Sequence, residues 1–456
     1  MSVSLAHPDY RENLGDGLIL RWSTAADLPA IQDLYAYVFR ESDDQPLNSR
    51  LPLWAADLAS GRHFSSDAND FALVEDTINN RIAAVLVVLR QKWNYEEIEF
   101  EIGRPEIVGS RPEYRNKGLV RRIFDLFHAR SAERGQLAQG ITGIAYFYRQ
   151  FGYEYALELE GQRRILFAGL PTLKEGEQEP YALRPATLDD LDLIGDLYRR
   201  EARGFPGHEA LVWTSFHPEW FRWALTDQNP ESGQGANIYI FTTPAGEPLG
   251  YVMLSRFRWG ETLPVFGLSA KPGVPLTAVM PSLLRQLAAL AQTIQPWREP
   301  APAATRLTLI LGEHHPVYEA INPNFISRTL PAYGWYVRVP DLPALIWKIA
   351  PVLEQRLLQS PIGAYSGELK FDFYRGGLRL VFEQGKLTVA EPWKRPTWKP
   401  GTSAGFPPLV FLQLLFGRRS LNDLMYAFPD VWAEEEIQAV LTTLFPKRRS
   451  WAIGLD

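Results

Sequence analysis

The sequence predicts an α/β (α+β) protein of several domains with mixed central sheets. Three observations lead to this prediction. The 456 residues exceed what one hydrophobic core supports, so two to four domains are expected. Segments with strand-like composition are followed by segments with helical spacing of apolar residues along most of the chain. One pattern of strand, cap and helix occurs twice.

The repeated pattern begins at Arg21 and again at Arg184. Each copy has a short strand, a cap rich in Thr and Asp, and a helix with apolar residues at helical spacing. Residues 169–180, between the copies, are rich in Gly, Pro and Glu, which is typical of a linker. We therefore expect two related domains, over residues 1–168 and 180–340.

The pattern of predicted helices and strands changes near residue 341. A helix is predicted over 342–358, followed by alternating strands over 367–374, 377–383 and 386–390. Amphipathic segments over 409–416, 420–428 and 433–445 close the chain. A third α+β domain is therefore expected over residues 341–456.

Composition excludes several classes of protein. The net charge of −6 argues against a nucleic-acid partner bound through a general basic surface. No apolar run is long enough for a membrane span and the N-terminus lacks a signal-peptide core, so we expect a cytoplasmic protein. The absence of cysteine excludes disulfides and any cysteine nucleophile. The seven histidines show no metal-binding spacing, so no metal is expected.

The segment from Val108 to Val120 predicts an anion site. A strand over 97–110 runs into a turn at Pro112, and a helix with an apolar stripe begins near Gly118. The first N–H groups of a helix have no intrahelical partner and carry partial positive charge. Gly118 allows close approach of a phosphate, and nearby basic side chains add charge. The alternative is an ordinary strand-to-helix turn with solvated basic residues.

This segment resembles motif A of the GNAT acetyltransferases, Val-x-Val-x-Pro-x-Tyr-Arg-x-x-Gly-x-Gly/Ala. Five positions match the motif, and two depart from it, Ser110 and Val120. The resemblance implies that acetyl-CoA is the co-substrate. The residues that it implies around acetyl-CoA are Val108, Gly109, Ser110, Arg115, Asn116, Lys117, Gly118, Leu119 and Val120.

The whole chain resembles the Eis-like acetyltransferases in its order of domains. The resemblance implies two tandem GNAT folds, followed by a domain like sterol carrier protein 2, and a homo-oligomer, in those relatives a hexamer. In the second copy, the turn Lys271 to Pro275 contains two prolines, which lack the amide donors of a phosphate loop. We therefore expect the second domain to be a duplicate that binds acetyl-CoA weakly or not at all.

Catalytic candidates follow from the same resemblance. Tyr148, at the start of a Tyr-x-x-Phe-Gly-Tyr segment, corresponds to the general acid of Eis-like enzymes, although it could be a core tyrosine with a satisfied hydroxyl. The base would be the carboxylate of the C-terminal Asp456, as the resemblance implies, or Glu106. Glu41 and Asp43 are candidates for the rim of the amine pocket.

Together these features predict an acetyl-CoA-dependent N-acetyltransferase. Because cysteine is absent, the acceptor would attack the thioester directly. The expected acceptor is an amine of a small molecule, either a polyamine or an aminoglycoside-like compound. Two alternatives stay open: a carrier that binds lipid or another hydrophobic ligand in the third domain beside a vestigial GNAT scaffold, and a protein-lysine acetyltransferase.

Overall fold

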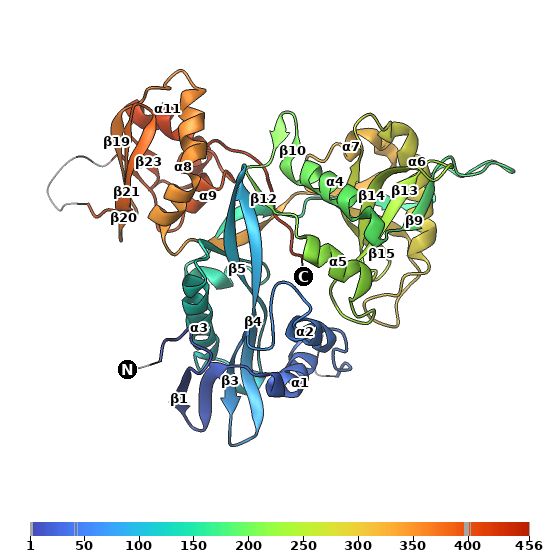
Figure 1. Ribbon diagram of the computed structural model, residues 1–456, viewed down its shortest axis with the longest axis horizontal. Helices are drawn as coiled ribbons and strands as arrows, with labels where there is room; N and C mark the ends of the chain where they lie inside the picture. Colours follow the sequence, from blue (N-terminus) through green and yellow to red (C-terminus); the bar gives the residue numbers. More distant parts are fainter. Residues whose placement is uncertain (1–2, 41, 43, 396–400, 402, 456) are drawn as a thin grey trace.

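The computed structural model describes residues 3–40, 42, 44–395, 401 and 403–455, which form three main sheets with helices packed on them (Figure 1). The first sheet lies at the bottom and centre of Figure 1, the second at the upper right and the third at the upper left. The first two sheets contain both parallel and antiparallel pairs. The predicted α/β (α+β) class is therefore confirmed.

The first sheet holds the segment that was predicted to bind an anion. Its strands are β1 (Arg11–Gly15), β2 (Leu18–Trp22), β3 (Phe71–Asp76), β4 (Arg81–Tyr95), β5 (Ile98–Ser110), β6 (Ala138–Ile141), β18 (Tyr333–Arg338) and β7 (Glu154–Leu159), in that spatial order, with β12 (Val212–Thr214) and β24 (Ser450–Trp451) attached beside β4. Helix α3 (Leu119–Glu133) packs on one face, and α1 (Leu28–Val38) and α2 (Leu51–Ala59) pack on the other. Strand β4 is covered on both faces, which explains its nearly continuous apolar sequence.

The second sheet repeats part of this plan. Its strands are, in spatial order, β17 (Ile326–Leu330), β8 (Gln162–Leu166), β16 (Arg306–Ile310), β15 (Thr262–Ala270), β14 (Pro248–Ser255), β13 (Ala236–Thr242) and β9 (Ala182–Pro185). Helices α4 (Leu191–Arg203), α5 (Pro218–Thr226), α6 (Leu276–Ala291) and α7 (Val317–Ala320) surround it, and β10 (Gly204–Phe205) pairs with β11 (His208–Glu209) in a small hairpin. In both sheets three antiparallel strands precede one parallel pairing, β5 with β6 and β15 with β16.

The two copies of the repeated pattern adopt the same local structure. In each copy a Thr and the Asp three residues later form a capping box, and the Arg of the strand pairs with that Asp. The closest nitrogen-to-oxygen distance is 2.6 Å for Arg21 with Asp27 and 2.7 Å for Arg184 with Asp190. The strand, the cap and the helix are therefore tied together in the same way twice.

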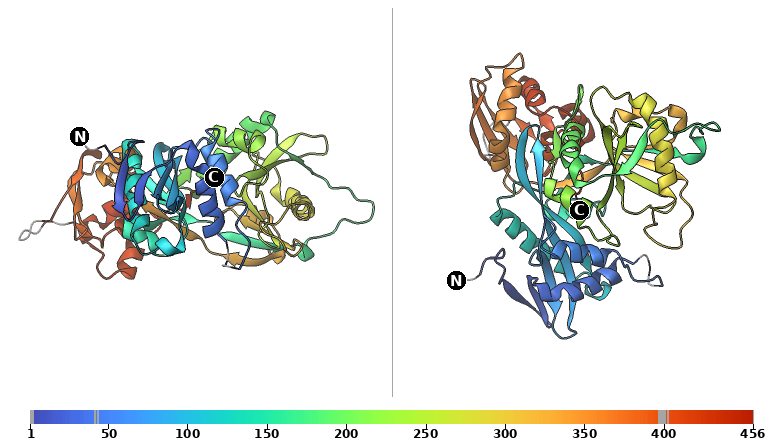
Figure 2. Two further views of the ribbon diagram at one scale, coloured as in Figure 1. Left: turned by 90° about the horizontal axis from the view of Figure 1, so that it is seen from below. Right: turned by 45° about the vertical axis from the view of Figure 1, so that its right-hand side comes forward.

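Two strands cross the predicted domain boundaries. Strand β8, from the range predicted as the first domain, lies in the second sheet between β16 and β17. Strand β18, from the range predicted as the second domain, lies in the first sheet between β6 and β7. Residues 170–180, in the predicted linker, form neither helix nor strand and extend away from the body of the protein (Figure 2).

The last third of the chain contains α8 (Leu342–Leu358), whose bounds match the predicted helix. The third sheet consists of β21 (Lys386–Pro392), β20 (Gly377–Glu383), β19 (Gly367–Asp372), β22 (Ala404–Gly405) and β23 (Trp432–Ala433). Helices α9 (Phe411–Leu415), α10 (Leu421–Ala427) and α11 (Glu435–Leu444) complete this region. Its core is continuous with apolar residues of the first sheet, such as Trp93 and Trp335.

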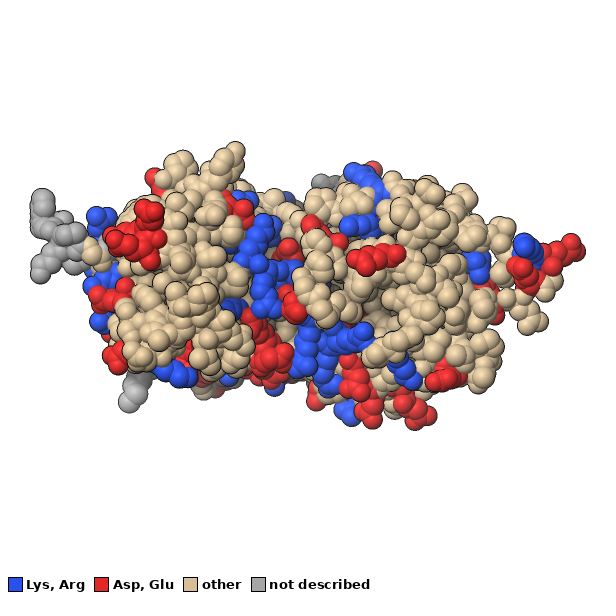
Figure 3. Space-filling model, turned by 90° about the horizontal axis from the view of Figure 1, so that it is seen from above, with Lys and Arg blue, Asp and Glu red and all other residues tan. Residues whose placement is uncertain are grey.

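The surface seen from above carries acidic and basic side chains close to one another (Figure 3). Among the helices that the structure describes, none has the length and apolar character needed to cross a membrane.

Candidate active site

The segment after β5 forms a turn with exposed backbone N–H groups. Gly118 caps α3 with a φ of 75°, and Asn116 has a φ of 62°, so two left-handed residues direct the chain into the helix. None of the hydrogen bonds between described residues uses the backbone N–H groups of Asn116 to Arg121. A Cβ added at Gly118 would have no other atom within 4 Å, so the space before these donors is open. The turn thus has the features of an anion site.

Tyr114 anchors this turn to the sheet. Its hydroxyl donates to the carboxylate of Asp76 and accepts from Nε of Arg81 at 3.0 Å. Although burial opposes ionisation, hydrogen bonds from Asn79 and Tyr114 lower the pKa of Asp76 to about 2. The side chains of Arg115 and Lys117 remain exposed, where they add positive charge beside the turn.

Strands β5 and β6 separate before they reach the turn. Their parallel pairing is limited to Ile102 with Ala138 and Gly103 with Gln139. A β-bulge at Ile107, whose φ is 47°, interrupts the pairing of β5 with β4. In the described part of the chain, residues 104–110 have no ladder partner on the edge facing β6. Val108, Gly109 and Ser110, which the resemblance implies around acetyl-CoA, lie within this stretch.

A cavity of about 500 Å³ extends from the turn into the gap between the two strands. Its lining includes eight of the nine residues that the resemblance implied around acetyl-CoA: Val108, Gly109, Ser110, Arg115, Asn116, Gly118, Leu119 and Val120. The ninth, Lys117, does not line it. Tyr148 also lines this cavity, together with Phe147 and Phe151. We name it the donor cavity.

Tyr148 lies in a short 3-10 helix, Phe147–Phe151, and is 4% exposed. Burial, with a further effect of the Glu106 carboxylate, raises the pKa of its hydroxyl well above the usual value. Among the described residues, none forms a hydrogen bond with this hydroxyl. In contrast, the hydroxyl of the neighbouring Tyr153 lies 3.1 Å from Nε2 of His128. Tyr148 therefore differs from a core tyrosine with a satisfied hydroxyl.

On β5, Glu106 lies between Arg104, which lines a second cavity, and Val108, which lines the donor cavity, but it lines neither cavity itself. Its carboxylate accepts a hydrogen bond from Arg104, and the two side chains are 16% and 2% exposed, respectively. Arg104 in turn packs over the ring of Trp335, with 4.9 Å from Cζ to the ring centroid. Three other predicted residues, Glu41, Asp43 and Asp456, lie outside the described residues.

The segment that leads to Asp456 is held between the first two sheets. Strand β24 pairs with β12, which pairs with β4. The indole of Trp335 donates to the carbonyl of Ala452 at 2.8 Å, and Thr214 exchanges two hydrogen bonds with the backbone of Ile453, each of 3.0 Å. Leu455 is 1% exposed. The C-terminal segment is therefore an integral part of the centre of the protein.

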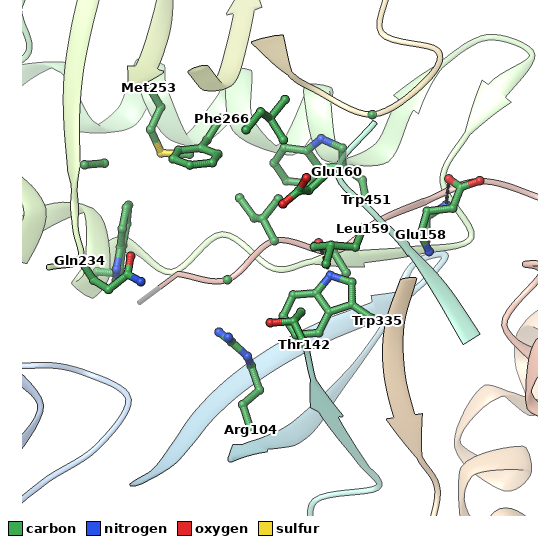
Figure 4. A pocket seen from close by; sticks show the side chains of 18 of the residues that line it. Arg104, Thr142, Glu158, Leu159, Glu160, Gln234, Met253, Phe266, Trp335 and Trp451 are labelled. Carbon is green, nitrogen blue, oxygen red and sulfur yellow. Dashed lines mark hydrogen bonds between the residues drawn. The ribbon is translucent and has the colours of Figure 1, made fainter. Parts of the chain in front are cut away.

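The second cavity, of about 260 Å³, lies between the first two sheets and beside this segment (Figure 4). Arg104 and Thr142 line it on the side of the first sheet, and Met253 and Phe266 line it on the side of the second. We name it the interdomain pocket. Sequence reasoning did not identify its residues, because apolar and aromatic side chains far apart in the chain give no local signal of a shared cavity.

In the second sheet, the stretch of β15 that corresponds to the free edge of β5 is not open to a ligand. Strand β15 has a bulge at Phe266, like the bulge in β5. Beyond it, the carboxylate of Glu201 accepts hydrogen bonds from the backbone N–H of Leu268 at 2.9 Å and from the hydroxyl of Tyr251 at 2.5 Å. Glu201 is 0% exposed. The buried carboxylate of Glu201 thus occupies the backbone N–H of Leu268, which the carbonyl group of a bound thioester would need as its donor.

The described residues contain no group of three or more His, Asp or Glu side chains placed to hold a metal ion.

Residues 20–156 match the family model described as acetyltransferase (GNAT) domain. This range contains the end of β2, β3 to β6, the turn at Gly118 and Tyr148. The chain therefore contains a GNAT acetyltransferase domain, and the protein is an acyltransferase. A search of the curated proteins finds no match.

Solved structures of similar fold cover almost the whole chain. A conserved protein of unknown function from Enterococcus faecalis, described as a probable N-acyltransferase, has a TM-score of 0.64 at 15% identity and covers 96% of this chain and 99% of its own. A GCN5-related N-acetyltransferase from Kribbella flavida has a TM-score of 0.62 at 17% identity, with 98% and 100% covered. Eis1 from Mycobacterium abscessus has a TM-score of 0.54 at 14% identity, with 96% and 99% covered. At identities of 14% to 17%, the similarity to these structures establishes the fold alone.

Proposed function

We propose that the protein is an acetyl-CoA-dependent N-acetyltransferase that modifies an amine of a small molecule. One observation supports this proposal most strongly. Backbone donors at Gly118 and the hydroxyl of Tyr148, none of which has a hydrogen-bond partner among the described residues, lie at the same cavity. A carrier protein would need neither feature, so the geometry favours an enzyme over a lipid carrier.

The donor cavity fits the chemistry of a CoA thioester. The N–H groups from Asn116 to Arg121 would hold the diphosphate, because they combine unpaired donors with the positive end of the α3 dipole. The free edge of β5 would bind the pantetheine chain and the thioester carbonyl. Acetyl-CoA supplies an activated acetyl group. The residues of the chain then have to position the acceptor amine, accept a proton from it and donate a proton to the departing sulfur.

The reaction converts an amine and acetyl-CoA into an N-acetylamine and free CoA. A bond forms between the amine nitrogen and the carbonyl carbon, and the bond from that carbon to sulfur breaks. The amine proton passes to a base, and the departing sulfur takes a proton from Tyr148. The hydroxyl of Tyr148 is protonated at neutral pH and can donate to sulfur as negative charge develops, and the proton taken up by the base is returned to Tyr148 at the end of the cycle.

Two carboxylates are candidates for the base. Glu106 lies on β5 between Arg104 and Val108, which line the two cavities, and its charge acts on the hydroxyl of Tyr148. The C-terminal carboxylate of Asp456 follows a segment that lines the interdomain pocket. An ordinary alkylamine is almost fully protonated at pH 7, so removal of its proton contributes substantially to the rate.

The tandem arrangement belongs to the same proposal. The second sheet shares the strand order and the bulge of the first, but Glu201 occupies its backbone donor and prolines occupy its turn. We therefore assign acetyl-CoA binding to the first copy. The region from α8 to α11 would be the domain like sterol carrier protein 2, with its apolar side chains used in the core.

The test is a thermal-shift measurement combined with an assay of CoA release. Acetyl-CoA is expected to raise the melting temperature, because a ligand that binds only the folded state stabilises it by mass action. A panel of amines should then support acetyl-CoA-dependent release of CoA. Stabilisation by fatty acids or sterols, without any effect of acetyl-CoA, would favour the carrier. Acetylation of peptide lysines only would favour a protein acetyltransferase.

A further inference from the structure

The interdomain pocket adjoins the donor cavity along two strands. On β5, Arg104 lines the pocket and Val108 lines the donor cavity. After β6, Thr142 lines the pocket and Ile144 lines the donor cavity. Between these last two residues, a Cβ added at Gly143 would lie 4.0 Å from the hydroxyl of Tyr148. A molecule in the pocket could thus present one end to the gap where the thioester is proposed to lie.

Aromatic side chains dominate the walls of the pocket. These residues, which come from both sheets, the turn between β14 and β15, α5 and the C-terminal segment, are Trp220, Trp259, Phe266, Trp335 and Trp451. All but Trp259 and Phe266 are nearly fully buried, and Met253 and Ile453 add further apolar surface. Walls of this kind bind flat apolar groups by burial and by edge or face contacts between rings.

Three charged side chains around the pocket, Arg104, Glu158 and Glu160, already take part in hydrogen bonds. Arg104 is bonded to Glu106. The carboxylate of Glu158 accepts from the backbone N–H of Ser450 at 3.3 Å, and burial raises the pKa of this carboxyl group. The carboxylate of Glu160 accepts from the Gln162 amide at 2.5 Å. Because no ion pair joins Glu158 or Glu160 to another described residue, a polycation could pair with at most these two carboxylates, while it would lose the hydration of several charges.

Another cavity adjoins the pocket and adds space for a ring at Trp259 and Phe266. Trp259 and Phe266, like Gln234 and Gly235, line both this pocket and a neighbouring cavity of about 660 Å³, so they lie at the boundary between the two spaces. Trp259 is 45% exposed and can therefore contact a ligand from either side. Figure 4 shows Phe266 and Met253 across the pocket from Arg104 and Thr142.

We propose that the acceptor is a primary amine on a short chain attached to an aromatic ring. The ring would lie among Trp259, Phe266 and Trp451, and the amine would reach toward Thr142 and Glu106. This inference rests on the proposed function and specifies its substrate class. It predicts a preference for arylalkylamines over polyamines and aminoglycosides.

The first experiment measures kcat/KM of the full-length protein with tryptamine, n-propylamine, spermidine and kanamycin. Tryptamine is expected to exceed each of the others by about tenfold or more, because the ring adds buried contact area. Equal or higher values for spermidine or kanamycin would overturn the inference and leave the acetyltransferase proposal intact. Absence of CoA release with every amine would contradict the proposed function itself.

The second experiment compares Trp259→Ala with Trp347→Ala. Trp347, on α8, is 46% exposed and does not line the pocket, so it is a control of matched type and exposure. Trp259→Ala should lower the ratio of kcat/KM for tryptamine to that for n-propylamine about tenfold, and mainly through KM. Trp347→Ala should leave this ratio unchanged. The same ratio in wild type and Trp259→Ala would contradict the placement of the ring.

A binding measurement separates the two proposals completely. Calorimetric titration of tryptamine into the wild-type protein with CoA present should show saturable binding that Trp259→Ala weakens about tenfold. No binding of tryptamine would overturn the inference whatever the turnover result. Binding without acetylation would support the pocket assignment and contradict the proposed enzymatic function.

Discussion

The guanidinium of Arg104 donates a hydrogen bond to the carboxylate of Glu106, two residues further along β5. Side chains two apart on a strand point to the same side, so the pair projects together where β5 leaves β6. One member lines the interdomain pocket, and the charge of the other acts on Tyr148. The pair therefore links the proposed acceptor and donor sites.

Replacement of Glu106 tests its role as the base. Glu106→Gln keeps the shape and removes the charge, and kcat is expected to fall about a hundredfold, as for the loss of a general base. The melting temperature reports whether loss of the ion pair between Arg104 and Glu106 destabilises the fold. Retention of kcat in a folded variant would shift the role to the carboxylate of Asp456.

Tyr148→Phe tests the proton donor. Removal of the hydroxyl should lower kcat about tenfold or more with little change in the affinity for acetyl-CoA, because the ring that lines the cavity is kept. Tyr146→Phe is the control, since Tyr146 is 71% exposed and does not line the donor cavity. A Tyr148→Phe variant as fast as the wild type would remove this residue from the mechanism.

His217 makes stability dependent on pH. Burial lowers its pKa to about 4, and Nε2 accepts from the backbone N–H of Lys92 at 3.2 Å, so the ring is neutral in the folded state. Below about pH 6.5 the unfolded state binds a proton that the folded state does not bind. This residue should therefore lower the free energy of unfolding as pH falls from about 6.5 to about 4, by up to about 3 kcal/mol.

Urea unfolding at pH 7 and pH 4.5 checks this effect. His217→Gln keeps a possible acceptor and removes the titrating group, so its loss of stability between the two pH values should be smaller than that of the wild type. His128, whose pKa burial lowers to about 3, remains in both proteins and contributes equally. An identical pH dependence in wild type and variant would be inconsistent with a neutral buried His217.

Local patterns predicted the elements that depend on local interactions. Helix α8 follows from its apolar spacing and from Asp341, whose side chain accepts from the N–H of Ala344. The turn at Gly118 follows from a strand that leads into a helix through a glycine. Both features are specified by residues close together in the chain, so a single sequence is sufficient to find them.

The exchange of β8 and β18 between the sheets was not predicted. A strand pattern specifies which face is buried but does not specify which sheet the strand joins. The set of residues that line the interdomain pocket was not predicted, for a similar reason. Its wall combines Trp220, Trp335 and Trp451, three tryptophans that each resemble ordinary core residues in their own segment.

The most direct test of the account is calorimetric titration of acetyl-CoA into the wild type, Gly118→Ala and Gly135→Ala. Both glycines border α3, have positive φ (75° and 68°) and leave open space for a Cβ, so backbone strain is similar in the two variants. We predict that Gly118→Ala raises the dissociation constant about tenfold or more, because the added Cβ occupies the open space in front of the donors and keeps the diphosphate from reaching them, and that Gly135→Ala leaves it unchanged. Equal affinities in all three proteins, or no binding to the wild type, would contradict the claim that the start of α3 binds the diphosphate.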